Sequence, residues 1–126
     1  MKKKIYYHHT DCGGVVYYAT YLEFLEEART EFLARKGIDT PELLKQGRLF
    51  VVSHQEVDYK APASYGDTLE ITTKVTEVSG VRIYLEHEVI RPDHSVAVKA
   101  RTTLACVDTT LRPRPLPAEL LGKIKA

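Results

Sequence analysis

Alternating polar and apolar residues fill much of the second half of this chain, and this pattern constrains the fold more than any other feature. From Leu49 to Asp108 the side chains alternate with a period of two, as they do on the two faces of a β-strand. Turn-forming residues such as Gly80 and Pro92 divide the block. The pattern predicts strands at 49–59, 68–78, 81–91 and 95–108. Because short turns separate them, we expect hairpins of an antiparallel sheet.

The segment 68–78 indicates that one face of this sheet is buried. Leu69 and Ile71 share one face, whereas Glu70 and Lys74 share the other. This alternation is typical of an antiparallel sheet that packs on a core with one face and meets water with the other.

The region before this block predicts one long helix. Its apolar residues recur at the spacing of one helical face, at Tyr21, Leu25, Ala28 and Phe32. Thr20 and Glu23 have the spacing of a capping box, and Gly37 is a suitable stop. We therefore expect a helix over about 20–36.

The remaining segments complete the predicted architecture. Residues 2–9 alternate loosely and predict a first strand, Thr40 opens a short helical turn, and 118–124 predicts a terminal helical turn. Five strands and one long helix favour an α+β fold in which a strongly curved antiparallel sheet wraps around the helix. The length of 126 residues predicts a single domain over 1–126.

Charge and cysteine content argue against several classes of partner. The formal net charge is +1, with 18 Lys and Arg against 17 Asp and Glu, so no basic face for nucleic acid is expected. No apolar run is long enough to cross a bilayer, and no signal peptide is readable after the basic start. Two cysteines, Cys12 and Cys106, favour a reducing compartment. We expect a cytoplasmic protein without nucleic-acid binding or stable membrane insertion.

Asp11 stands in a glycine-bearing turn immediately before the predicted helix. Free amides of such a turn and of a helix N-terminus can hold a carbonyl oxygen as it becomes negatively charged. The carboxylate could then attack the carbonyl or activate a water molecule. A thioester fits one carboxylate best, because its thiol has a pKa near 8.5 and leaves as a thiolate.

A structural interpretation of the same turn stays open. Asp is a favoured turn and cap residue, and Gly13 and Gly14 supply positive φ angles in many turns without any catalytic purpose. The residue types alone do not separate the two interpretations.

The stretch from Tyr7 to Tyr17 resembles the signature of the 4-hydroxybenzoyl-CoA thioesterase family of hotdog-fold enzymes. The matching positions are Tyr7, Thr10, Asp11, Gly13, Gly14, Val15, Val16 and Tyr17, followed by Tyr21, Glu26 and Arg29. Within the family the likeness is to the bacterial acyl-CoA thioesterase branch associated with the Tol-Pal system. The blocks 57–67 and 101–108 also resemble family blocks, so the likeness extends over most of the chain.

The resemblance implies roles for individual residues. Asp11 matches the catalytic carboxylate, as nucleophile or general base, and the backbone N–H of Tyr18 matches the amide that polarises the thioester carbonyl. Tyr7 matches a tyrosine implicated in the branch. The branch often has His where this chain has Tyr18, so a phenol replaces a better acid and base.

The family's assembly and substrate are implied in the same way. A dimer joined edge to edge, often doubled into a tetramer, would hold acyl-CoA between subunits, with no cofactor besides the CoA of the substrate. We assign substrate binding to His9, Gly14, Val15, Tyr17, Lys60 and Arg82. Lys60 and Arg82 are candidates for the CoA phosphates because they stand near strand ends, although such charges also protect sheet edges.

Other functions are less well supported by the residues. His8, His9, Asp11 and Cys12 do not predict a metal site, because neighbouring strand residues point to opposite faces. A hotdog domain that binds acyl thioesters without hydrolysing them, or an envelope-associated interaction module, remains an alternative. A hotdog dehydratase would need a His-Asp or His-Glu pair that we cannot place in this sequence.

Overall fold

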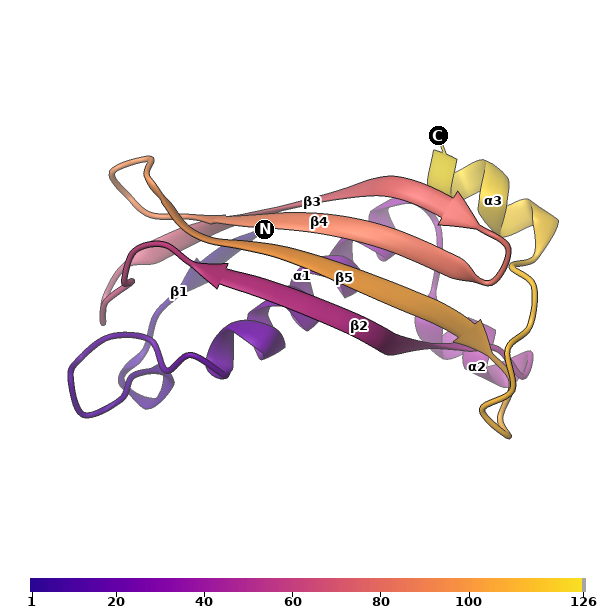
Figure 1. Cartoon of the computed structure of the whole chain (residues 1–126), viewed down its shortest axis with the longest axis horizontal. Helices are drawn as coiled ribbons and strands as arrows, with labels where there is room; N and C mark the ends of the chain where they lie inside the picture. Colours follow the sequence, from indigo (N-terminus) through magenta and orange to yellow (C-terminus); the bar gives the residue numbers. More distant parts are fainter. Residues whose placement is uncertain (126) are drawn as a thin grey trace.

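A single antiparallel sheet with a long helix on one face forms the body of the protein (Figure 1). The computed structural model describes residues 1–125. The strands are β1 (Lys2–Lys4), β2 (Leu49–Tyr59), β3 (Thr68–Ser79), β4 (Arg82–Ile90) and β5 (Val96–Val107). Their order in the sheet is β1-β3-β4-β5-β2, and every pairing is antiparallel. The predicted α+β architecture is confirmed.

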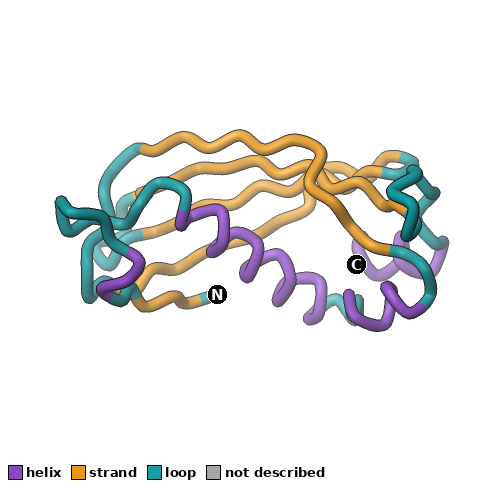
Figure 2. Tube along the Cα trace, turned by 90° about the horizontal axis from the view of Figure 1, so that it is seen from below, coloured by secondary structure: helices purple, strands orange, loops and turns teal. Residues whose placement is uncertain are grey.

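The helices lie on one side of the sheet, as the view from below shows (Figure 2). They are α1 (Thr20–Arg35), α2 (Thr40–Lys45) and α3 (Ala118–Lys125). The predicted helix over about 20–36 is confirmed: α1 ends at Arg35, and Gly37, two residues later, has the φ of +82° that suits a glycine after a helix. No helix within residues 1–125 combines the length and apolarity that crossing a membrane requires.

Strand β2 forms one edge of the sheet. It pairs with β5 from Leu49↔Val107 to Tyr59↔Val98, with a bulge between Val52 and His54. Since β5 lies on one side only, the other side of β2 presents backbone groups that no strand of the described chain pairs. An open edge of 11 residues is a template for another strand.

Two clusters of buried side chains fill the space between α1 and the sheet. Phe24 and Leu25 of α1 belong to the first cluster, and Leu33 near the other end of α1 belongs to the second. Fully burying each such side chain contributes about 1.5–3 kcal/mol. Two buried polar residues of the sheet, His87 and Thr102, belong to neither cluster.

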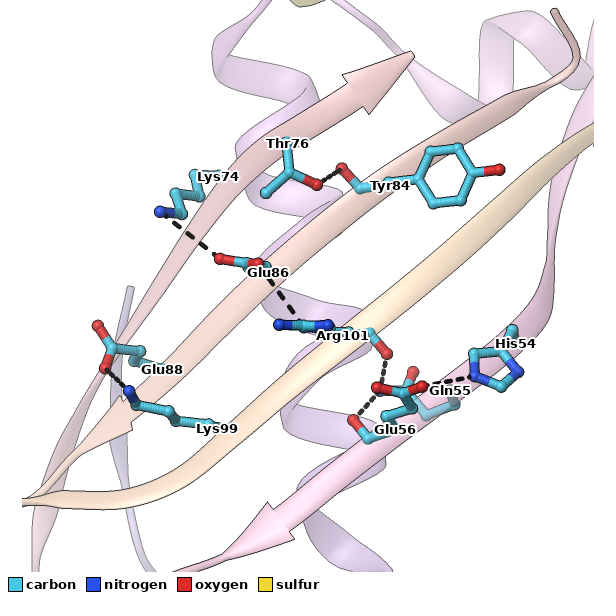
Figure 3. A network of polar contacts seen from close by, with 10 residues as sticks. All are labelled: His54, Gln55, Glu56, Lys74, Thr76, Tyr84, Glu86, Glu88, Lys99 and Arg101. Atoms are coloured by element: carbon cyan, nitrogen blue, oxygen red, sulfur yellow. Dashed lines mark hydrogen bonds and ion pairs between the residues drawn. The ribbon is translucent and has the colours of Figure 1, made fainter. Parts of the chain in front are cut away.

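The other face of the sheet is polar, as the alternation in 68–78 predicts (Figure 3). Charges of opposite sign stand side by side on neighbouring strands: Glu86 lies 3.5 Å from Lys74 and 3.7 Å from Arg101, and Glu88 lies 3.9 Å from Lys99. Exposed pairs of this kind contribute about 0–1 kcal/mol each, so this face supplies solubility more than stability.

Two predictions about local structure are wrong. The first strand does not extend over 2–9: it ends at Lys4, and Tyr7–His9 form a short 3-10 helix, η1. The cause is a local competitor for the backbone, because the Tyr6 N–H donates to His9 Nδ1 at 2.9 Å. The capping box is also absent, since Ala19 is the N-cap of α1 and no side chain caps it.

Candidate active site

Asp11 lies in a tight hairpin between β1 and α1. Its N–H donates to Val15 O at 2.9 Å, and its own C=O accepts from the Gly14 N–H at 3.1 Å. The side chain adds a third bond, because Oδ1 accepts from the Gly13 N–H at 2.7 Å. Asp11 is exposed, and the described residues give Oδ2 no hydrogen bond or ion pair. One carboxylate oxygen thus holds the turn, while the other is bonded to no group within residues 1–125.

The geometry of the hairpin explains why glycine stands at positions 13 and 14. Gly14 has φ of +80°, in the left-handed region that residues with a Cβ rarely adopt. A Cβ on Gly13 would stand 3.2 Å from Asp11 Oδ1, so a side chain there would crowd the carboxylate. The glycines therefore allow the turn and the approach of the Gly13 amide to the acid.

The segment after β2 contacts this hairpin through backbone bonds. Val16 N–H donates to Ala63 O at 2.8 Å, and Val15 forms an isolated bridge with Ser64. Arg91, at the end of β4, fixes the segment by donating from Nη1 to Pro62 O at 2.9 Å. The sequence block 57–67 thus contributes directly to the base of the site.

Tyr18 connects the hairpin to α1. The preceding residue is anchored, because Tyr17 N–H donates to His9 O at 2.9 Å. No acceptor for the Tyr18 N–H lies within residues 1–125, and its side chain is 62% exposed. The amide that the resemblance assigns to the carbonyl is therefore free for a ligand.

His9 and Tyr7, both in η1, occupy contrasting environments. His9 is buried with its ring edge-on to Phe24 at 5.1 Å, and its Nδ1 accepts from Tyr6 N–H. Burial, and next the neighbouring His8, lower the pKa of His9. Tyr7 is exposed, and its ring meets Tyr65 edge-on at 5.8 Å. His9 thus supports the loop from inside, whereas Tyr7 stands at its surface.

The two proposed phosphate ligands stand at opposite ends of the sheet. Lys60 is exposed and follows β2, at the end where Asp11 lies. Arg82 begins β4 at the β3–β4 turn, which is the far end (Figure 1). β3 runs 12 residues between these ends, about 36 Å at the usual rise. One subunit therefore does not bring Arg82 to its own Asp11.

Exposed tyrosines surround the hairpin, and three of them, Tyr6, Tyr59 and Tyr65, were not predicted from the sequence as part of the site. Six tyrosines with large exposed fractions belong to this end of the molecule: Tyr6, Tyr7, Tyr17, Tyr18, Tyr59 and Tyr65. Tyr59 and Tyr65 flank the segment that supports the hairpin. Their position in the block 57–67 was the available signal, but a strand pattern does not reveal which side chains reach a loop from another part of the chain.

Two open hollows of the described surface lie on the polar face of the sheet, and neither is lined by Asp11. The larger, of about 510 Å³, covers the polar face of the sheet and is lined by residues such as Glu86, Lys99 and Arg101.

Residues 1–125 contain no group of three or more His, Cys, Asp or Glu side chains suited to a metal ion. His8 and His9 were predicted to point to opposite faces of a strand, and this prediction is wrong. Both residues lie in η1, where their ring centroids are 4.0 Å apart.

Comparison with known proteins agrees with this geometry. A model of the thioesterase-like superfamily matches residues 7–124. The acyl-CoA thioester hydrolase YbgC of Escherichia coli O6:H1 is 35% identical over 97% of this chain and 92% of that protein. The acyl-CoA thioesterase YbgC of Haemophilus influenzae is 40% identical over 93% of this chain and 87% of that protein.

The fold agrees as well. The crystal structure of a probable thioesterase from Bartonella henselae superposes with a TM-score of 0.86 at 34% identity, covering 93% of this chain and 97% of that one. The hotdog fold implied by the sequence resemblance is confirmed, with α1 as the central helix and β1 to β5 as its wrapping. From the span of the family match and the identity to its members, the chain belongs to the thioesterase-like superfamily.

Proposed function

We propose that this protein hydrolyses acyl-CoA thioesters to a free acid and CoA, with Asp11 as the catalytic carboxylate. The observation that carries the proposal is the hairpin itself: Oδ1 is fixed by the Gly13 N–H at 2.7 Å, and Oδ2 has no partner within residues 1–125. A carboxylate whose orientation is set by its own turn is prepared to act with its second oxygen. The relatives named above support thioester hydrolysis as the reaction.

The mechanism follows from the two groups that the hairpin leaves free. The Tyr18 N–H binds the thioester oxygen and stabilises the negative charge that develops there. Acting as general base, Asp11 takes a proton from water while the water oxygen bonds to the acyl carbon. The C–S bond then breaks, and the proton returns to the departing thiolate. Acting as nucleophile, the Asp11 carboxylate bonds to the acyl carbon while the C–S bond breaks and the CoA thiolate leaves; water then hydrolyses the resulting mixed anhydride to the free acid and restores the carboxylate.

We also propose that the working unit is a homodimer or a dimer of dimers, with the acyl-CoA pocket between subunits. The open edge of β2 supports this assembly, because a second β2 can pair with it and extend the sheet. A CoA-binding role for Arg82 requires this assembly, because Arg82 lies at the end of its own subunit that is far from Asp11. In such an assembly Lys60 of one subunit and Arg82 of another are placed to bind CoA phosphates.

The remaining parts of the proposal concern substrate binding and location. Tyr7 acts at the mouth of the site, Gly14, Val15 and Tyr17 line it, and His9 supports it from inside. CoA belongs to the substrate, so the reaction uses no separate cofactor. The exposed free thiol of Cys12 fits a reducing cytoplasm, where we place the protein.

A panel of aliphatic and aromatic acyl-CoAs, with released CoA detected by a thiol-reactive dye, tests the proposal. The expected result is turnover of at least part of the panel, with kcat/KM varying between acyl groups. Absence of thiol release across the panel, combined with measurable binding by calorimetry, would establish the alternative of a binding module instead.

A further inference from the structure

Tyr59 reaches from the last position of β2 to the start of α1. Its hydroxyl donates to Tyr18 O at 2.9 Å, across 41 positions of sequence. Its ring also packs on both aromatic neighbours, at 6.4 Å from Tyr18 and 5.8 Å from Tyr21 between ring centroids. Tyr59 is thus fixed by packing, and its hydroxyl bonds the backbone.

The bonding of Tyr18 makes this contact unusual. Its N–H has no acceptor within residues 1–125, and its C=O has no backbone donor among them, because α1 begins two residues later. The hydroxyl of Tyr59 holds the peptide group after Tyr18, whereas the peptide group before it, which carries the Tyr18 N–H, is held by the Thr20 N–H, which donates to Tyr17 O at 2.9 Å. One hydrogen bond thus holds the backbone on each side of Tyr18, and the Tyr59 side chain supplies one of them.

The state of the hydroxyl suits this role. Burial, and next the nearby Tyr18 phenol, raise the pKa of Tyr59 above its ordinary value. The phenol therefore keeps its proton at neutral pH and can serve as a donor to the Tyr18 carbonyl.

We propose that Tyr59 is a positioning residue for the reaction: by holding the Tyr18 carbonyl, it restrains the ψ angle of Tyr18 and, together with the bond from Thr20 N–H to Tyr17 O, keeps the Tyr18 N–H directed at the thioester oxygen. This inference rests on the proposed function of that amide. It differs from a binding role, because the Tyr59 hydroxyl is already engaged by the protein. Loss of the Tyr59 hydroxyl should therefore weaken the polarisation of the thioester carbonyl more than it weakens the binding of the substrate.

The variant Tyr59→Phe keeps the ring contacts and removes only the hydroxyl. A neutral hydrogen bond contributes about 0.5–1.5 kcal/mol, which corresponds to about a twofold to tenfold lower kcat. KM should stay within about twofold. The matched control is Tyr84→Phe on the polar face of the sheet, whose hydroxyl has no hydrogen-bond partner among residues 1–125 (Figure 3). It should turn over substrate at the wild-type rate.

A second readout does not depend on turnover. A ketone analogue of benzoyl-CoA, with CH2 in place of sulfur and ¹³C at the carbonyl, is not hydrolysed, and infrared difference spectra report its carbonyl stretch when bound. Binding to the wild type and to Tyr84→Phe should lower this frequency equally, and binding to Tyr59→Phe should lower it less.

The two readouts separate the inference from the function on which it rests. If the protein hydrolyses no acyl-CoA but the analogue binds with the expected frequencies, the proposed reaction fails while the positioning by Tyr59 holds. Equal frequencies in Tyr59→Phe and wild type would overturn the inference, as would an unchanged kcat in Tyr59→Phe or an equal loss in Tyr84→Phe.

Discussion

Asp11 and its glycines form a turn in which each residue type has a separate physical task. The Asp11 carboxylate accepts from the Gly13 N–H, and Gly14 supplies the positive φ that closes the hairpin. The structural interpretation of this Asp is therefore correct, and the catalytic one is compatible with it, because only one of its two oxygens is used. The two hypotheses that the sequence left open concern different atoms of the same side chain.

Replacing Gly14 tests the strain in this turn. Gly14→Ala has room, since no atom lies within 4 Å of the added Cβ, but its φ of +80° costs about 1–2 kcal/mol for a residue with a Cβ. We expect a free energy of unfolding that is lower by about that amount, measured by urea denaturation.

Gly122 in α3 is the matched control. The same substitution, Gly122→Ala, also meets no atom within 4 Å, but it replaces glycine by the best helix former. It should raise the free energy of unfolding by up to about 1 kcal/mol. Equal effects of the two substitutions would show that Gly14 has no conformational role.

At the level of elements, α1 and the sheet enclose a histidine between their two apolar clusters. His87 of β4 is 2% exposed, its Nδ1 lies 3.0 Å from Thr73 Oγ1, and its Nε2 has no partner within residues 1–125. The pKa of His87 is lowered from 6.5 to about 4, chiefly by burial and to a smaller extent by the nearby Arg29, while a hydrogen bond at the Thr72 backbone partly opposes this shift. The packed layers therefore hold this ring neutral.

A neutral buried histidine makes stability depend on pH. The unfolded chain binds a proton near pH 6.5 and the folded one only near pH 4, so stability is complete above 6.5 and falls between these values. Linkage gives a loss of about 2 kcal/mol between pH 7 and pH 5. Urea denaturation at the two pH values should show a loss that is smaller by about this amount in His87→Leu than in the wild type, because only other groups such as the buried His9 still contribute to it.

The exposed His54 provides the comparison for this experiment. Its Nε2 lies 3.1 Å from Glu56 Oε1 on the polar face, and because both side chains are exposed this pair contributes only about 0–1 kcal/mol, so His54→Gln should lose nearly as much stability as the wild type between pH 7 and pH 5. If His87→Leu loses as much stability as the wild type between pH 7 and pH 5, the buried ring is not the cause.

The elements could be predicted from the sequence wherever the evidence was local and periodic. The strand at 49–59 has the predicted bounds, and α1 begins at Thr20 as expected, because alternation and helical spacing record which face is buried. The short helix η1 could not be predicted, since it depends on one side-chain bond from Tyr6 to His9. Tyr59 could not be assigned to the site, because its partner Tyr18 is 41 positions away.

For the whole molecule, the main open feature is the edge formed by β2. Val52 and Tyr59 are large hydrophobic residues that β2 leaves exposed, 43% and 49% respectively. Pairing of this edge with a second copy would cover them and bring a second subunit to the hairpin. Assembly and catalysis are then expected to be lost together.

A charge at the edge tests this coupling. Val52→Asp should shift the oligomer toward the monomer in sedimentation velocity and reduce thioester hydrolysis in parallel, because burying an unpaired carboxylate at a seam is costly. Thr76→Asp places the same charge at an exposed position of β3 and should change neither the oligomeric state nor the rate of thioester hydrolysis. A Val52→Asp protein that remains a full oligomer would place the subunit contact elsewhere.

The central claim is that the free oxygen of Asp11 performs the chemistry, and the rate of thiol release by Asp11→Asn tests it most directly. The amide oxygen of Asn can still accept from the Gly13 N–H, so the turn is kept while the base or nucleophile is lost. The exposed Asp39, whose side chain makes no cap bond to α2, gives the control Asp39→Asn. We predict that kcat falls at least about a hundredfold in Asp11→Asn, with the oligomer intact, and is unchanged in Asp39→Asn. Near-normal turnover by a folded Asp11→Asn protein would contradict the account.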